Sequence, residues 1–146
     1  MSDVFSNLDP RLAAALDSKG WKPTPVQVAT LPDLCDGGDR IIVAPTGSGK
    51  TMSAVLPMLN RCLVEGWKPL SILYITPLRA LNRDVDRRLN EITEAVGLKV
   101  GLRHGDTKQS ERSRQVRNPP DLLVTTPETF QLMFTGKNLR ELLKRV

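Results

Sequence analysis

The stretch that most constrains the fold is APTGSGKT, residues 44–51. It follows a short β-branched run, RIIVA (40–44), and precedes an apolar-periodic segment at 50–65, so we predict a strand, a loop and a helix in that order. Gly47 and Gly49 let successive backbone N–H groups point into one concavity, to which the following helix adds the positive end of its dipole. The pattern predicts a phosphate-binding loop, although Ala44 stands where the general pattern has glycine.

Within this loop, Lys50 and Thr51 are the predicted catalytic residues. The Lys50 ammonium would reach the β- and γ-phosphates of a nucleotide as a point charge, and the Thr51 hydroxyl would ligate Mg²⁺. The alternative interpretation is a glycine-rich turn that merely precedes a lysine. Because strand, Gly-x-Gly-Lys-Thr and amphipathic helix occur together, we favour the phosphate loop.

The rest of the chain alternates helices with short apolar strands, which is typical of an α/β fold with a parallel sheet covered on both faces. A length of 146 residues predicts one domain. Helices are predicted at 8–20, with Asp9 as N-cap and Pro10 in the first turn, and at 24–38. Further strands are predicted at 71–76, 98–103 and 121–126, and further helices at 78–96, within 104–120 and at 138–146.

Three predicted helices begin with a Thr-Pro pair, at 24–25, 76–77 and 126–127. Threonine at the N-cap followed by proline is a good helix start in any protein, which is a purely structural interpretation. The second and third pairs directly follow strands, however, so in a parallel sheet both helix N-termini would open at the carboxyl edge. Helix ends with hydroxyls, close to Arg79 and Arg83, suit the phosphates of a nucleic-acid backbone.

Composition narrows the choice of partner. The net charge of +5 fits a polyanionic partner, and the aromatic content of only 4% favours contact with a nucleic-acid backbone over stacking on bases. No apolar run is long enough to cross a membrane and the first residues do not resemble a secretory signal, so we expect a cytoplasmic protein. Cys35 and Cys62 have no metal-ligand spacing and are expected to be buried or half-buried thiols.

Five segments of the chain have the order and the rough spacing of motifs in a known family: GWKPTPVQ, APTGSGKT, TPLRAL, RHGDT and PPDLLVTTPETF. Together they resemble the N-terminal motor domain of superfamily 2 (DEAD/DEAH-type) nucleic-acid helicases, and most of all the large helicase-related ATP-dependent DNA helicases. The resemblance covers nearly the whole chain. It implies a P-loop NTPase fold of the RecA-like kind, ATP and Mg²⁺ as cofactors, and a nucleic-acid partner, DNA rather than RNA, in translocation, unwinding and DNA repair.

The resemblance also implies roles for individual residues. Gln27 would read the adenine edge, and the residues from Thr46 to Thr51 would hold the triphosphate, with Ala44 being the superfamily's own variant. Nucleic-acid contacts would come from TPLRAL, from the turn in RHGDT and from TTPE; the residues implied are Thr76, Pro77, Arg79, Gly105, Asp106, Thr126 and Glu128. Residues 1–39 would thus form the adenine-recognition helices, and residues 40–146 the phosphate loop and nucleic-acid motifs.

Two further features are weighed on the residues alone. His104, the single histidine, is expected to be a turn residue or a phosphate contact rather than a general base. The basic residues Lys108, Arg112, Arg114 and Arg117 form either a solvated face or a nucleic-acid contact.

Hydrolysis in such helicases needs an Asp-Glu pair on a later strand and arginines from a second RecA-like domain. Neither is found in these residues, so we expect an incomplete domain with the remainder of the motor missing, weak ATP binding and negligible turnover. Two other functions stay open. One is a non-catalytic module that binds nucleic acid or a partner and keeps the loop as scaffold; the other is a different P-loop enzyme, such as a small kinase or a GTPase.

Overall fold

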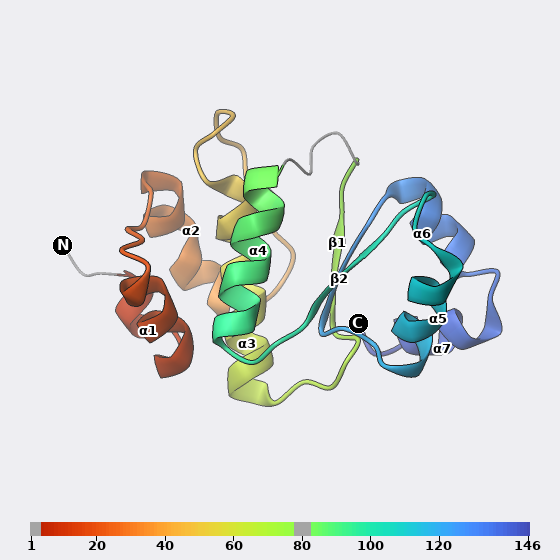
Figure 1. The fold of residues 1–146 in the computed structure, drawn as a ribbon. Coiled ribbons are helices and arrows are strands. Elements are labelled where there is room, and N and C mark those ends of the chain that lie inside the picture. The colour runs from red at the N-terminus through yellow and green to blue at the C-terminus, as the bar shows by residue number, and fades with distance from the viewer. Residues whose placement is uncertain (1–3, 78–82) are drawn as a thin grey trace. The chain divides into compact units, whose positions relative to one another are not determined.

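The computed structural model describes residues 4–77 and 83–146 and divides into two compact units, Met1–Trp67 and Lys68–Val146 (Figure 1). Each unit is described by itself. The predicted functional division into residues 1–39 and 40–146 stays a prediction. Helix α2 and the helix that follows the phosphate loop both belong to the first unit.

The first unit is helical. A short 3-10 helix, η1 (Val4–Asn7), which the sequence did not predict, precedes α1 (Pro10–Ser18), α2 (Pro25–Cys35) and α3 (Lys50–Glu65). The predicted start of α1 is confirmed, because the Asp9 side chain caps the helix by accepting from the backbone N–H of Arg11 at 3.0 Å. Helices α2 and α3 pack against each other. Fully buried leucines form the core; they are Leu12, Leu16, Leu31, Leu56 and Leu59.

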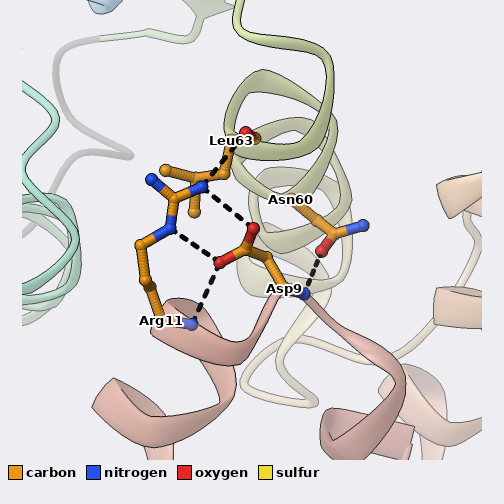
Figure 2. Close-up of polar contacts among 4 residues, drawn as sticks. All are labelled: Asp9, Arg11, Asn60 and Leu63. Atoms are coloured by element: carbon orange, nitrogen blue, oxygen red, sulfur yellow. Dashed lines mark hydrogen bonds and ion pairs between the residues drawn. The ribbon is translucent and has the colours of Figure 1, made fainter.

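A polar contact ties the start of α1 to the last turns of α3 (Figure 2). The backbone N–H of Asp9 donates to Oδ1 of Asn60 at 2.6 Å. The Arg11 guanidinium donates to both carboxylate oxygens of Asp9, at 2.9 and 3.0 Å, and to the carbonyl of Leu63 at 3.1 Å. The arginine therefore bridges a helix-capping carboxylate and a carbonyl of α3, which holds α1 against the helix that starts at the phosphate loop.

The predicted strand at 40–44 is wrong for this structure. These residues form no strand, and the side chains of Ile41 and Val43 are 93% and 90% exposed. The β-branched composition of the run favours an extended chain, but a strand also requires hydrogen bonds from a neighbouring strand. The first unit contains no strand among its described residues, so the segment has nothing within its own unit to pair with.

The second unit is an α/β fold. Its described elements are β1 (Ile72–Ile75), α4 (Arg83–Ala95), β2 (Val100–Arg103), α5 (Gln109–Arg117), β3 (Leu122–Thr125), α6 (Pro127–Met133) and α7 (Lys137–Leu143). The three strands form a parallel sheet in the order β1-β3-β2, which confirms the three predicted strands in this unit. In Figure 1, α4 lies on one side of this sheet and α5, α6 and α7 lie on the other. The predicted long helix begins at 78, but residues 78–82 lie outside those described.

The central strand β3 is buried at every position. A continuous apolar run is expected for a parallel strand with neighbours on both sides and helices on both faces. On one face, Leu123 packs with Leu70 and Met133, and half-buried leucines from β1 and α7 complete this cluster. None of the described helices is both long and apolar enough to span a membrane.

Replacing Asp9 with alanine removes a helix cap and the partner of Arg11, and we expect it to lower the free energy of unfolding by about 1 kcal/mol at neutral pH. The hydrogen bond from Arg11 lowers the pKa of Asp9 below its ordinary value of 3.8. The stabilisation from this carboxylate is therefore complete well above pH 3.8 and is lost as the pH falls through the lowered pKa. Urea unfolding should show the wild type and Asp9→Ala converging in acid.

The matched control is Asp17→Ala, since Asp17 is an exposed residue of the same helix. A difference between wild type and Asp9→Ala that stays constant with pH, or that equals the effect of Asp17→Ala, would contradict this reading of the contact.

Candidate nucleotide and nucleic-acid sites

The phosphate loop has the backbone that its glycines predict. Gly47 and Gly49 have φ of 77° and 96°, in the left-handed region that favours glycine. The N–H of Ser48 donates to the carbonyl of Pro45 at 3.3 Å, which closes a turn, and α3 begins directly afterwards at Lys50. The structure thus brings the residues from Thr46 to Thr51 together in one loop at a helix N-terminus.

Gly49 also lies very close to the start of α2. A Cβ atom built on Gly49 would lie 2.8 Å from Nε2 of Gln27 and 2.8 Å from Oγ1 of Thr24, closer than carbon can approach. Nε2 of Gln27 donates to the carbonyl of Gly49 at 3.3 Å. The absence of a side chain at Gly49 therefore lets α2 and the phosphate loop touch.

Gln27, the predicted adenine reader, is only 6% exposed and is held by protein groups at both ends of its amide. Besides the bond from Nε2 to Gly49, its Oε1 accepts from the N–H of Thr24 at 3.0 Å. This second bond belongs to a capping box at the start of α2. The amide keeps a second N–H and a second lone pair beyond these two bonds.

Lys50 and Ser48 show how the loop is arranged. Nζ of Lys50 donates to the carbonyls of Ala44 and Pro45, the second at 2.8 Å. The Ser48 hydroxyl is buried without a hydrogen-bond partner in the described chain, an uncommon state for a buried polar atom. The loop therefore holds a cation and a buried hydroxyl next to the N–H groups that open α3.

The nucleic-acid candidates of the second unit gather at one edge of its sheet. Ile75 of β1 and Arg103 of β2 both stand opposite Thr125 of β3. Since all strands are parallel, the residues that follow these three positions leave from the same edge. Thr76, Thr126 and the turn after Arg103 thus lie at the carboxyl edge, where the Thr-Pro pattern predicts the first two. A helix begins at Pro127 as predicted, whereas Pro77 is not helical and the residues after it lie outside those described. The phosphate loop belongs to the other unit.

Individual candidates differ in their surroundings at this edge. Thr76 is buried, and its N–H donates to the carbonyl of Thr125 at 3.0 Å. Thr126 caps α6, with Oγ1 accepting from the N–H of Thr129 at 3.3 Å, and Glu128 in the first turn is exposed. Pro77 is exposed as well. The predicted contact of Arg79 lies outside the described residues.

The turn at 104–107, which contains Gly105 and Asp106, is braced by an arginine that the sequence did not single out for this purpose. Arg112 of α5 donates from Nε to the carbonyl of Thr107 at 2.9 Å, and from Nη2 to the carbonyls of His104 and Gly105 at 3.0 and 2.9 Å. Arg112 is thus more than part of a solvated face. No spacing rule links an arginine to carbonyls five to eight residues earlier, so sequence reasoning had no signal for this contact.

His104 is a turn residue, as expected. Its Nδ1 accepts from the N–H of Asp106 at 3.2 Å, and its own N–H donates to Oγ1 of Thr107 at 2.8 Å. The ring is thereby engaged in holding the exposed Gly105 and Asp106 at the tip of the turn. As expected for thiols, Cys62 is buried and Cys35 is half-buried.

Comparison with known proteins gives a consistent family. The family model for DEAD/DEAH box helicases matches residues 24–146. The Lhr helicase/uracil glycosylase of Escherichia coli strain K12 is 40% identical over 86% of this chain, and the ATP-dependent helicase Lhr-Core of Sulfolobus acidocaldarius is 35% identical over 99% of it. The solved structure of Mycobacterium smegmatis helicase Lhr bound to ssDNA and AMP-PNP is similar over 99% of this chain, with a TM-score of 0.82 and 32% identity.

These similarities define the class: an α/β, RecA-like fold with a phosphate loop, of the kind that helicases share. The chain belongs to the DEAD/DEAH box helicase family. It spans 9% of the E. coli relative, 18% of the S. acidocaldarius relative and 20% of the M. smegmatis chain.

The contact between Gly49 and α2 can be tested with two alanine variants. Gly47→Ala places a side chain at positive φ in open space, which should cost about 1 kcal/mol of unfolding free energy. Gly49→Ala carries the same backbone cost, and its methyl group also pushes the side chains of Gln27 and Thr24 away from residue 49. We therefore expect it to lower the free energy of unfolding by at least about 1 kcal/mol more than Gly47→Ala does. Urea or thermal unfolding measures both. Equal destabilisation by the two variants would show that α2 does not press on Gly49.

Proposed function

We propose that this chain is the ATP-binding part of an ATP-dependent nucleic-acid helicase, which couples ATP hydrolysis to translocation and unwinding. The observation that carries the proposal is the loop at the N-terminus of α3, where two left-handed glycines, an unpartnered buried hydroxyl and a lysine adjoin a helix dipole. The relatives named ATP-dependent helicase and the M. smegmatis neighbour with bound AMP-PNP support the same function.

The loop fits a triphosphate through its own groups. The backbone N–H groups of Gly47, Ser48 and Gly49 would donate to phosphate oxygens, and the Ser48 hydroxyl would gain the partner that it lacks. The Lys50 ammonium would exchange its bonds to the carbonyls of Ala44 and Pro45 for the β- and γ-phosphates, where its charge is better compensated. These residues bind and orient the nucleotide for attack by water.

For Mg²⁺, the structure offers the Thr51 hydroxyl in the first turn of α3. The Thr51 hydroxyl would hold a divalent cation that helps to neutralise the charge of the phosphates. Among residues 4–77 and 83–146, no three His, Cys, Asp or Glu side chains are grouped to hold a metal ion on their own. A divalent ion would accordingly arrive with the nucleotide, neutralising its charge, and Thr51 would help to orient the complex.

We propose that Gln27 recognises adenine, a role that its contact with the phosphate loop at Gly49 supports. Its remaining N–H can donate to N7 of adenine and its remaining lone pair can accept from the N6 amino group. The same amide already contacts the carbonyl of Gly49. With the phosphates of a nucleotide on the loop, the Gln27 side chain would contact both the loop and the base. Its hydrogen bonds to adenine would favour ATP over other nucleotides.

Nucleic acid is proposed to bind at the carboxyl edge of the second unit through Thr76, Pro77, Gly105, Asp106, Thr126 and Glu128. Arg79, which the sequence also implies, lies outside the described residues. The level ends of β1, β2 and β3 and the brace of Arg112 support this surface. Similar helicase structures hold ssDNA in one case and ssRNA in another. We favour DNA for this chain, since the structure that holds ssDNA is 32% identical to it and the one that holds ssRNA is 17% identical.

Lys50→Ala tests the nucleotide site. We expect the wild-type chain to bind a fluorescent ATP analogue weakly and the variant to lose about tenfold or more in affinity, because a charge-assisted bond to phosphate disappears. Lys68→Ala, which removes an exposed lysine outside the loop, is the control and should bind as the wild type does. Unchanged binding in Lys50→Ala, or a preference for GTP, would favour a scaffold module or another P-loop enzyme instead.

Binding of single-stranded oligonucleotides tests the second half of the proposal. Backbone contacts release counterions, so about four phosphate contacts correspond to roughly a 50-fold loss of affinity between about 50 and 200 mM salt. Fluorescence anisotropy with several unrelated sequences should give one common affinity at each salt concentration. Sequence-selective binding, or binding that salt leaves unchanged, would argue against contact through the backbone.

A further inference from the structure

The starting point is Arg103, the last residue of β2. It is only 7% exposed, and the hydrogen bonds that it makes within the described chain come from Nη1 alone, to the carbonyl of Arg112 and to Oε1 of Gln115, both at 3.3 Å. Both acceptors are neutral and thus do not balance the charge of the guanidinium. Since only Nη1 is engaged, Nε–H and Nη2 can donate to a ligand. Burial lowers the pKa of Arg103, with repulsion from Arg112 as the second cause, and no carboxylate among the described residues counteracts either effect.

Arg103 lines a cavity of about 280 Å³ between α5 and the start of α7. Two further arginines of α5, Arg112 and Arg117, line the same cavity with polar side chains of Gln109, Ser113 and Asn138, and none of the described residues that line it is acidic. Arg117 is exposed and makes no ion pair within the part of the chain that is described. Three cations therefore face one cavity without an anion.

The distribution of charge on α5 makes this cavity distinct. The one carboxylate of the helix, Glu111, is held by Arg114 at 2.8 Å and accepts from Gln115 at 3.1 Å. Glu111 and Arg114 line a different cavity, beside α4 and the start of β2. The acid is thus engaged elsewhere, and a buried arginine without a counter-charge is costly unless an anion supplies one.

We propose that Arg103, Arg112 and Arg117 form a phosphate-binding pocket. Guanidinium groups match the tetrahedral oxygens of a phosphate with paired N–H donors, and the cavity is large enough to admit one such group. Arg103 binds through Nε and Nη2, and Arg117 closes the mouth. Arg112 binds through Nη1, since its Nε and Nη2 already hold the turn at 104–107, so a bound phosphate is linked to that turn through one side chain.

A backbone phosphate of nucleic acid and a free phosphate ion share this chemistry. The sequence left Arg112 and Arg117 open between a solvated face and a nucleic-acid contact, and Arg103 begins the RHGDT segment, but the shared cavity is visible only in the structure. Phosphate binding here does not depend on a nucleotide at the loop. The phosphate pocket can therefore be tested separately from the proposed helicase function.

The test is an NMR titration of the full 146-residue chain, labelled with ¹⁵N, with sodium phosphate at constant ionic strength. The Nε–H signals of Arg103 and Arg117 should shift and saturate, and Arg117→Gln should weaken binding about tenfold because one charge-assisted contact is lost. Arg114→Gln is the matched control, since it removes an exposed arginine of the same helix that lines the other cavity. Its affinity for phosphate should equal that of the wild type.

Arg103→Gln should abolish saturable binding of phosphate. Since Arg103 is buried, this variant can fail to fold, and in that case the result with the exposed Arg117→Gln decides the test. Absence of saturable shifts, or equal affinities in wild type and Arg117→Gln, would overturn the pocket. A second titration compares a single-stranded DNA decamer with the same decamer carrying neutral methylphosphonate linkages. Shifts with the charged strand only identify a backbone phosphate as the ligand, whereas shifts with inorganic phosphate but neither strand identify a free phosphate.

Discussion

Parallel pairing of β3 with both of its neighbours is the interaction on which the second unit depends. Its buried residues Leu122 to Thr125 pair with β1 on one side and β2 on the other, and helices lie on both faces of the sheet. Because the three strands run the same way and end level, every connection after a strand leaves from one edge. Thr76, Thr126 and the turn at 104–107 lie at one edge of the sheet for this reason, with Thr76 itself buried.

Two arginines near that edge differ in their contacts. Arg112 turns its guanidinium inward to three carbonyls and holds an exposed turn in place, while Arg103 is buried beneath it with neutral acceptors only. The first arrangement makes the turn a stable feature that a ligand can meet without ordering it first, which saves conformational entropy. The second leaves a positive charge inside the unit, and this charge is the physical basis for the phosphate pocket.

In the first unit, contact between α2 and the phosphate loop has the corresponding importance. Gly49 allows Gln27 to reach the loop, and the contact from Asp9 and Arg11 to α3 holds α1 against the helix that the loop begins. A nucleotide on the loop would therefore act on α2 through a single amide. The elements of this unit are local in sequence, but their functional connection is made by packing.

Local signals in the sequence predicted much of the fold. The caps at Asp9, Thr24 and Thr126, the glycine loop before α3 and the apolar runs of β1, β2 and β3 depend on neighbouring residues, so they can be interpreted without a structure. The run at 40–44 shows the limit. Its composition is that of a strand, but Ile41 and Val43 are exposed because a strand also needs a partner, which local sequence cannot specify.

By itself, the sequence determined the phosphate loop, the strands of the second unit and the resemblance to helicases, since each depends on residue type at close spacing. Only the tertiary structure decided that Gln27 contacts Gly49, that Arg112 holds the turn, and that Arg103 is buried without a counter-charge among the described residues. These contacts join residues from different elements. Which residues meet in these contacts is set by the way helices and strands pack, and a spacing pattern along the chain does not specify that packing.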